Sequence, residues 1–361
     1  MRGKILSNLC RCTMGAMLLV LSACRVGLSG PGNNATPIKN PADIHVGFVA
    51  ETMTENFALE MLYGAQYAAK QFNVSAQIMA PASVNPTQEL NFFNGLTQTA
   101  RDGIAVETLE PDLFVTPETN AVSSGIPVIA VDTIASKVPT ITTYIGNDNV
   151  TAGAMLAQAT IDRLSPAAKG VIMIGNDHPG VPVLDYRVQG MQQVFKSQRP
   201  DLQLVTPFNA QELPDPNHAA WNSAVNAYPD AIACLGTGDS SVASLATIKQ
   251  ATHGTYLASA FNLNEAGLQA VANGTIFALA DPEHFLKGYV AMRLLIEHAL
   301  YGNAIPKGWW NPGAMLVTQN NVQAIITRQS SPDNRGKYFQ PIIDQEFANP
   351  SAVMKPLDQA K

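Results

Sequence analysis

Basic residues and catalytic motifs are scarce in this chain. Its 361 residues include 22 lysines and arginines against 28 acidic residues, a net charge of −6 without any basic run. A nucleic-acid partner requires such a basic patch and is therefore not expected. The six histidines show no metal-ligand spacing, and no P-loop, G-x-S-x-G, H-E-x-x-H or C-x-x-C motif occurs. We expect neither a metal nor a cofactor, and no enzyme.

No apolar run is long enough to span a bilayer, which needs about 20 residues. Residues 14–23 (MGAMLLVLSA) instead follow a basic start and fit a signal-peptide core of roughly 7 to 15 residues. The junction Leu21-Ser22-Ala23-Cys24 resembles the bacterial lipobox, whose cysteine becomes the lipidated first residue. An ordinary secretory signal with an incidental cysteine is the alternative. We interpret residues 1–23 as a lipoprotein signal peptide of an extracytoplasmic, membrane-anchored protein.

The residues after this leader extend that interpretation. Residues 24–42 begin with the proposed lipidated Cys24 and are rich in Gly, Pro, Asn and Ser, as expected of a flexible tether. Cys10 and Cys12 lie in the leader, so Cys234 alone remains in the body of the chain. No intramolecular disulfide can form in the mature protein, and Cys234 is predicted to be a buried hydrophobic residue.

From residue 43 onward, short apolar runs alternate with amphipathic stretches. This alternation predicts an α/β fold of βα units around parallel sheets. Its length favours two similar doubly wound lobes. Strands are expected at residues 44–50, 77–80, 103–107 and 127–131 in the first lobe, and at 170–175, 203–206, 231–235, 255–259 and 276–280 in the second. Helices are expected between them, including residues 185–198, 218–227, 240–250 and 264–272.

Ligands of open parallel sheets bind at the carboxyl ends of the strands. Polar residues stand there after several of the predicted strands, and they form the candidate site. They include Glu51 to Phe57, Glu110, Asp132, residues 176–187, Thr237 to Asp239, Asn262 and Asp281.

Three segments resemble the type I periplasmic binding proteins, and the ribose-binding-like, sugar-binding branch in particular. They are GIPVIAVDT (125–133), YIGNDNVTAG (144–153) and YRVQG (186–190). The resemblance implies two lobes joined by a three-crossing hinge, with a ligand cleft between them. It assigns residues 43–146 and 282–311 to the first lobe, 147–281 and 312–325 to the second, and helix 284–301 to the first. Residues 326–361 extend beyond the family and are either disordered or packed across a lobe.

The resemblance also assigns roles in binding a ligand. Asp132 matches a carboxylate that accepts hydrogen bonds from ligand hydroxyls, and Arg187 matches an arginine that donates a fork of hydrogen bonds. Phe57 matches an aromatic ring that packs on the apolar face of a sugar. The ligand-binding set is Glu55, Phe57, Glu110, Asp132, Arg187, Thr237 and Asn262.

Each of these residues also has a local interpretation. Asp132 could cap the residues that follow it, Arg187 could pair with Asp185, and Phe57 could belong to the core. Glu55 and Glu110 could be solvated loop acids. Asp148 and Asp239 precede predicted helices and are expected to be N-caps.

Departures from the ribose-binding pattern weaken any assignment of ribose itself. Thr133, Gly238, Asn262 and Ala280 replace residues that are typical of that branch, and the segment from Pro282 to Gly288 is two residues longer. The resemblance implies a monomeric solute-binding protein that delivers a monosaccharide, a derivative or another polyol to the permease and ATPase of an ABC importer. A sensor subunit for a membrane receptor is the alternative, and an extracytoplasmic enzyme on this fold is a weaker one.

Overall fold

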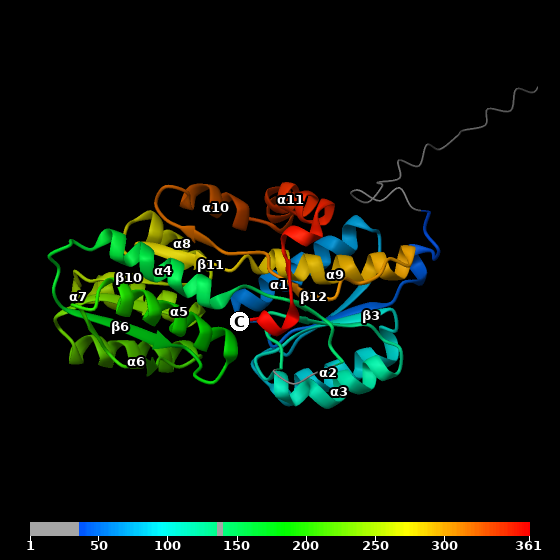
Figure 1. Ribbon diagram of the computed structural model, residues 1–361, viewed down its shortest axis with the longest axis horizontal. Coiled ribbons are helices and arrows are strands. Elements are labelled where there is room, and N and C mark those ends of the chain that lie inside the picture. Colours follow the sequence, from blue (N-terminus) through cyan, green and yellow to red (C-terminus); the bar gives the residue numbers. More distant parts are fainter. Residues whose placement is uncertain (1–35, 136–139) are drawn as a thin grey trace, which may run out of the picture.

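The computed structural model describes residues 36–135 and 140–361, which form two α/β lobes lying side by side (Figure 1). Each lobe is built on a seven-stranded sheet, as the alternation of apolar runs predicts. The leader, Cys24 and the tether up to residue 35 lie outside the described residues. Among the described helices, none is long and apolar enough to cross a membrane.

The first lobe contains the sheet ordered β14-β12-β5-β4-β3-β1-β2, which is parallel except where β14 joins β12. Helices cover both of its faces. The strands are β1 (Val46–Val49), β2 (Ala76–Met79), β3 (Gly103–Glu107), β4 (Val128–Val131), β5 (Thr143–Ile145), β12 (Gly308–Trp310) and β14 (Met354–Lys355), and the helices are α1 (Asn56–Gln71), α2 (Pro86–Thr99), α3 (Pro111–Ser123), α9 (His284–Tyr301) and α11 (Pro332–Ala348).

The second lobe contains the sheet ordered β13-β11-β10-β9-β6-β7, with β8 also paired to β6. Only β13 runs antiparallel to its neighbour. The strands are β6 (Val171–Asn176), β7 (Gln203–Leu204), β8 (Phe208–Asn209), β9 (Ala231–Gly236), β10 (Leu257–Phe261), β11 (Ala278–Asp281) and β13 (Met315–Val317), and the helices are α4 (Asn149–Arg163), α5 (Pro182–Gln198), α6 (Pro214–Ala227), α7 (Asp239–Thr252), α8 (Glu265–Ala272) and α10 (Val322–Gln329).

The central strands are apolar throughout because both faces of each sheet are covered. Successive side chains of a strand point to opposite faces. In β4, Ile129 and Val131 therefore join the core beneath α1 and α9, whereas Val128 and Ala130 join the core on the opposite face. Cys234 of β9 is fully buried in the core of the second lobe, as predicted.

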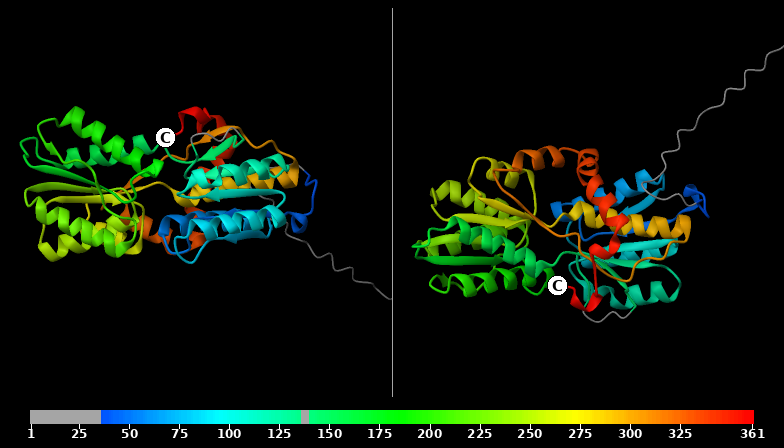
Figure 2. Two further views of the ribbon diagram at one scale, coloured as in Figure 1. Left: turned by 90° about the horizontal axis from the view of Figure 1, so that it is seen from below. Right: turned by 45° about the horizontal axis from the view of Figure 1, so that its top comes forward.

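The chain passes between the two sheets after β5, after β11 and after β12 (Figure 2). These passages fall where the family resemblance implies crossings. A further passage follows α10, which packs on α8, because α11 returns to the first lobe and packs on α1 and α9. Along α11, Phe339 and Ile343 are buried in the core of the first lobe. The tail is therefore folded onto a lobe, and the alternative of a disordered tail is wrong.

One close helix pair in each lobe determines where the polar residues of the cleft lie. Helices α1 and α9 pack so closely that a Cβ atom on Gly288 would lie 1.9 Å from the carbonyl oxygen of Met61. Helices α4 and α5 pack in the same way, since a Cβ on Gly153 would lie 2.1 Å from the carbonyl oxygen of Arg187. Lys287 directly precedes Gly288, so the α1–α9 contact fixes the backbone of Lys287. The α4–α5 contact fixes the backbone of Arg187 in the same way.

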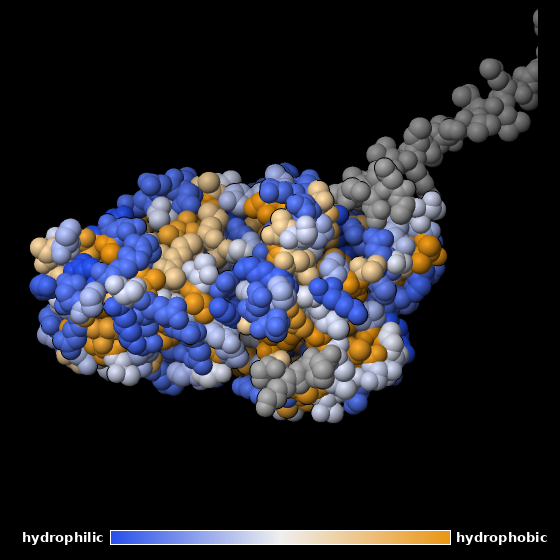
Figure 3. All heavy atoms as spheres, in the orientation of Figure 1, coloured by the Kyte–Doolittle hydropathy of each residue, from blue (hydrophilic) through white to orange (hydrophobic). Residues whose placement is uncertain are grey.

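The visible surface gives no sign of a large apolar interface. On the face shown in Figure 3, hydrophobic residues occur in small groups among hydrophilic ones. Large apolar side chains that are exposed are few among the described residues and scattered, as is normal for a soluble protein surface.

Candidate ligand cleft between the lobes

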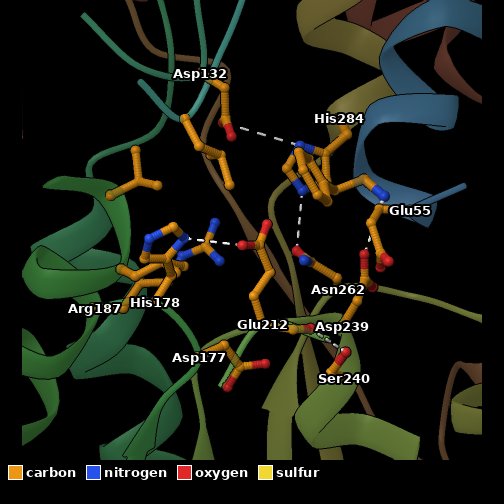
Figure 4. Close-up of a pocket in the computed structure, with 15 residues that line it drawn as sticks. Glu55, Asp132, Asp177, His178, Arg187, Glu212, Asp239, Ser240, Asn262 and His284 are labelled. Atoms are coloured by element: carbon orange, nitrogen blue, oxygen red, sulfur yellow. Dashed lines mark hydrogen bonds and ion pairs between the residues drawn. The ribbon is translucent and has the colours of Figure 1, made fainter. Parts of the chain in front are cut away.

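A small cavity lies between the lobes, at the carboxyl ends of the strands (Figure 4). Its volume is about 40 Å³, which is room for only a few water molecules. Five acidic residues and one arginine line it, together with two histidines and several apolar side chains. The polar members are Glu55, Asp132, Asp177, His178, Arg187, Glu212, Asp239, Ser240, Asn262 and His284.

The lobes are in contact at this cavity. The backbone N–H of Phe57, at the start of α1, donates to Asp239 Oδ2 of the second lobe at 3.1 Å. The side-chain amide of Asn56 donates to the carbonyl oxygen of Leu263. The structure is therefore a closed form, and a sugar-sized ligand requires the lobes to move apart.

Asp132 is held by a cation from within its own lobe. It follows β4 and has a φ of 64°, a left-handed conformation that Asp tolerates better than most residues. Lys287 of α9 is fully buried and donates to Asp132 Oδ1. Burial alone would raise the pKa of Asp132, but the charges of Lys287 and Arg187 and the hydrogen bond from Lys287 outweigh it and lower this pKa to about 2. Asp132 is therefore ionised, and its Oδ2 has no partner among the described residues.

His284 stands one helical turn before Lys287 and completes this side of the cavity. Its Nδ1 lies 3.2 Å from Lys287 Nζ, and its Nε2 lies 3.0 Å from Asn262 Oδ1 of the second lobe. Burial and the Lys287 charge lower the pKa of His284 well below its usual value. The neutral ring therefore accepts from Lys287 at Nδ1 and donates to Asn262 at Nε2.

Arg187 enters the cavity from the second lobe with no carboxylate bound to it. Its Nε donates to Asn149 Oδ1 at 3.1 Å and its Nη1 to the carbonyl oxygen of Thr237 at 2.8 Å. The guanidinium also lies over the ring of Phe261, 4.4 Å from its centre. Its Nη2 has no partner in the described part of the chain, so this nitrogen can donate to a ligand.

The second lobe also supplies three carboxylates. Asp177 accepts hydrogen bonds from the backbone and the hydroxyl of Ser241, whereas Glu212 pairs with His178 at 3.0 Å. Asp239 Oδ1 is buried without a partner in the described structure. Burial is the main cause that raises the pKa of both Asp177 and Asp239 to about 7, and nearby Glu55 adds to the effect at Asp239.

The structure brings five of the seven candidate ligand-binding residues to this cavity. They are Glu55, Phe57, Asp132, Arg187 and Asn262. Phe57 is half-buried, lines the cavity and packs on the first core, so its core role is confirmed and its contact with a ligand stays a prediction. Thr237 is fully buried behind Arg187, where its backbone orients the guanidinium. Glu110 is exposed at the start of α3, outside the cavity.

The local interpretations of the aspartates have different outcomes. Asp148 accepts from the backbone N–H of Thr151 and caps α4, as predicted. For Asp239 the capping prediction is wrong, because Gly238 holds the N-cap position and the carboxylate turns to Phe57 across the cleft. Asp185 bonds Asn176 and Gly180 instead of Arg187, and the carboxylate of Asp132 bonds Lys287 instead of capping its neighbours.

Sequence reasoning missed His284, Lys287 and Glu212 as members of the site or its support, whereas His178 lies in the candidate segment 176–187. The extra length from Pro282 to Gly288 was the available signal for the first two, because it shifts the start of α9. Glu212 sits in a loop before α6, where no pattern distinguishes it from a solvated acid. Within residues 36–135 and 140–361 no group of His, Cys, Asp and Glu could hold a metal ion.

Two α/β lobes that close on a polar cavity define the class of two-lobed solute-binding proteins. The family model described as a periplasmic binding protein domain matches residues 46–304, so the chain belongs to that family. It is a family of extracytoplasmic binding proteins without catalytic activity.

Individual relatives are distant but cover most of the chain. The xylose/arabinose-binding protein XylF of Sulfolobus acidocaldarius is 20% identical over 295 residues, which cover 77% of this chain and 72% of XylF. An ABC transporter solute-binding protein from Burkholderia graminis, in complex with D-arabinose, superimposes with a TM-score of 0.73 at 22% identity, covering 80% of this chain and 99% of that one. GanP, a glucose-galactose binding protein from Geobacillus stearothermophilus, superimposes with a TM-score of 0.69 at 21% identity. The match covers 77% of this chain and 98% of GanP. At these identities the structures establish a shared fold.

Proposed function

We propose that this chain captures a monosaccharide or a related small polyhydroxylated molecule and delivers it to an ABC importer. The observation that carries the proposal is the pairing of Asp132 and Arg187. Both side chains are buried, they come from different lobes, and each keeps an atom without a partner in the described structure beside one cavity. A ligand with several hydroxyls can donate to one and accept from the other.

The chemistry of the cavity agrees with a sugar. Charge-assisted hydrogen bonds that a carboxylate accepts or a guanidinium donates are roughly twice as strong as neutral ones. Phe57 and the neighbouring ring of His284, whose centres lie 5.9 Å apart, supply an apolar surface for the C–H face of a sugar ring. Relatives named for arabinose, xylose, glucose and galactose support the same ligand class.

Closure of the lobes is the proposed mechanism of capture. Residues 43–146 with 282–311 and residues 147–281 with 312–325 would each move as a unit about the passages after β5, β11 and β12. A ligand that forms bonds to both lobes shifts the equilibrium toward the closed form. The size of this shift is the difference between the ligand's affinities for the closed and the open form. Lipid attachment at Cys24 would keep the protein beside its permease.

A thermal-shift screen tests the ligand class. The purified chain is heated with pentoses, hexoses, deoxysugars, inositols, amino acids and peptides. A ligand at 100 times its Kd adds about 2.7 kcal/mol of stability, a clear rise in melting temperature. The proposal expects the response among the sugars or inositols, and a response confined to amino acids or peptides would overturn it.

The membrane anchor is tested separately. Labelled fatty acid should enter the wild-type chain and be absent from Cys24→Ala. Equal labelling of the two would contradict lipidation at this residue.

A further inference from the structure

Three carboxylates line the part of the cleft away from Asp132: Glu55 lies beside Asp239, and Glu212 points toward His178 (Figure 4). Glu55 comes from the first lobe, immediately before α1. Glu212 and Asp239 come from the second lobe, from the loop before α6 and the first residue of α7. We call these three residues the acidic end of the cleft.

The acidic end holds acceptor atoms that nothing in the described chain satisfies. Asp239 Oδ1 and Glu212 Oε1 are both buried and have no hydrogen-bond partner there. Asp239 as a whole is only 9% exposed. Leaving a buried charged group without its partner costs several kcal/mol, so such atoms point to a missing donor.

Protein cations balance this end only in part. Lys287 is bound to Asp132 instead, and His178 pairs with one oxygen of Glu212, which leaves Glu55 and Asp239 without an ion pair in the described chain. Arg187 is held by Asn149 and Thr237 and makes no ion pair with any of the three acids. Because Glu55 and the other two acids belong to different lobes, closing the empty cleft brings like charges together.

We propose that the natural ligand carries a protonated amino group, as in an amino sugar or an aminated cyclitol, and that this group lies at the acidic end. The inference rests on the proposed function and refines its ligand class. An ammonium group has three donors and no acceptor, which matches a site whose unpartnered atoms are carboxylate oxygens. It would relieve their repulsion and join the lobes, while the hydroxyls of the ligand reach Asp132 and Arg187.

The electrostatics of Asp239 support this assignment. Burial first and the neighbouring Glu55 second raise its pKa to about 7, and the hydrogen bond from Phe57 and the charge of Arg187 do not offset them. A cation at this position would reverse the effect of both causes.

Calorimetry on matched ligand pairs tests the proposal. The pairs are D-glucosamine with D-glucose, D-galactosamine with D-galactose and scyllo-inosamine with scyllo-inositol, at about pH 7, where such amines are largely charged. In at least one pair the amine should bind about 10- to 100-fold more tightly. N-acetyl-D-glucosamine, which keeps the nitrogen but loses the charge, should lose this advantage.

Variants locate the effect within the cleft. Asp239→Asn keeps the shape of the side chain and should reduce the ratio of amine affinity to neutral-sugar affinity at least about fivefold. Glu55→Gln, at a half-buried position, serves the same purpose if the first variant does not fold. The matched control is Asp215→Asn, which removes an exposed carboxylate from α6 of the same lobe and should leave the preference unchanged.

The possible results separate the two proposals. Equal or tighter binding of the neutral member in every pair overturns the amine and leaves the sugar-binding function intact. An amine preference that survives in both Asp239→Asn and Glu55→Gln also overturns it. If neither member of any pair, nor any other sugar, binds the wild-type protein, the proposed function itself fails.

Discussion

Asp132 and Asp239 line the same cavity from different lobes and have opposite electrostatics. Each follows shortly after a strand, each is at least nine-tenths buried, and each lines the same cavity. The pKa of Asp132 is lowered to about 2, whereas that of Asp239 is raised to about 7. Burial is the largest influence on both groups and acts in the same direction, so it does not explain the difference.

The difference comes from a cation built into one lobe only. Helix α9 places Lys287 against Asp132, whereas no described cation contacts Asp239. The first lobe thus presents a carboxylate that is ionised and oriented before a ligand arrives. The second lobe presents a carboxylate that depends on the ligand for its counter-charge. Binding energy gained at Asp239 is therefore available to favour closure.

The largest expected effect follows removal of the built-in cation. Lys287→Met leaves Asp132 buried and unpaired, and we expect a loss of about 3 to 5 kcal/mol in the free energy of unfolding at neutral pH. Denaturant unfolding measures it. In the wild type, the depressed pKa of Asp132 contributes stability above about pH 4 that is lost as the pH falls toward 2.

The double variant Lys287→Met/Asp132→Asn is the control for this change. It removes both charges and should recover part of the lost stability, because a neutral amide costs less to bury than an unpaired carboxylate. A loss below about 1 kcal/mol in the single variant would show that the ion pair does not determine the state of Asp132.

The second prediction concerns Arg187, which forms no ion pair with a carboxylate of the described chain. Arg187→Ala should weaken binding of the identified ligand about 10- to 150-fold, because a charge-assisted hydrogen bond to the ligand is lost. Calorimetry measures the affinity. Melting curves of the empty variant serve as the control for folding. Unchanged affinity would assign Arg187 to local structure beside Asn149 and Thr237.

The third prediction is a gain in the free energy of unfolding, whereas the first is a loss. The folded pKa of Asp239 lies above its unfolded value of about 3.9, so the folded state binds more protons between about pH 4 and pH 7. Asp239 therefore costs stability as the pH rises through this window. Asp239→Asn should remove that cost and stabilise the empty protein by on the order of 1 to 2 kcal/mol at pH 8, with little change near pH 4.

Urea unfolding at both pH values checks this result. Asp215→Asn, in which an exposed carboxylate is removed, should change stability by only a few tenths of a kcal/mol at either pH. If Asp239→Asn destabilises the protein equally at both pH values, the carboxylate is structural and the contrast with Asp132 fails.

Most of the fold could be predicted from the sequence because it depends on local periodicity. The apolar run from Pro127 to Val131 indicates a strand covered on both faces, whereas helix 284–301 was assigned to the first lobe by the family resemblance. The β5, β12 and β14 strands are too short to produce a pattern of their own. Helix α11 was missed because only a few apolar residues, with Phe339 and Ile343 the most deeply buried, secure an otherwise polar helix to the first lobe.

The candidate site was predictable only in part, for a different physical reason. Asp132 and Arg187 were found because the carboxyl ends of parallel strands converge. A lysine within a helix normally faces solvent, but α9 is buried on nearly all sides and packs closely on α1 at Gly288, so Lys287 lies in the interior. Asp239 looked like an N-cap because its position relative to the helix is ambiguous by one residue, and that one residue turns the carboxylate into the cleft.

The smallest predicted change in stability compares Asp239 with Asp148, a residue that does cap its helix. Asp148 is a true N-cap, since its carboxylate accepts from Thr151 N–H at 3.0 Å. Asp148→Ala should therefore cost about 1 kcal/mol of stability, whereas Asp148→Asn, which retains the acceptor, should cost less. Asp239→Asn should show the opposite sign at pH 8, because its carboxylate satisfies no amide at the start of its own helix. Thermal unfolding of the three variants at pH 8 measures the comparison. Equal losses in Asp148→Ala and Asp239→Asn would mean that both residues act as helix caps, and the acidic end of the cleft would then lose its central member.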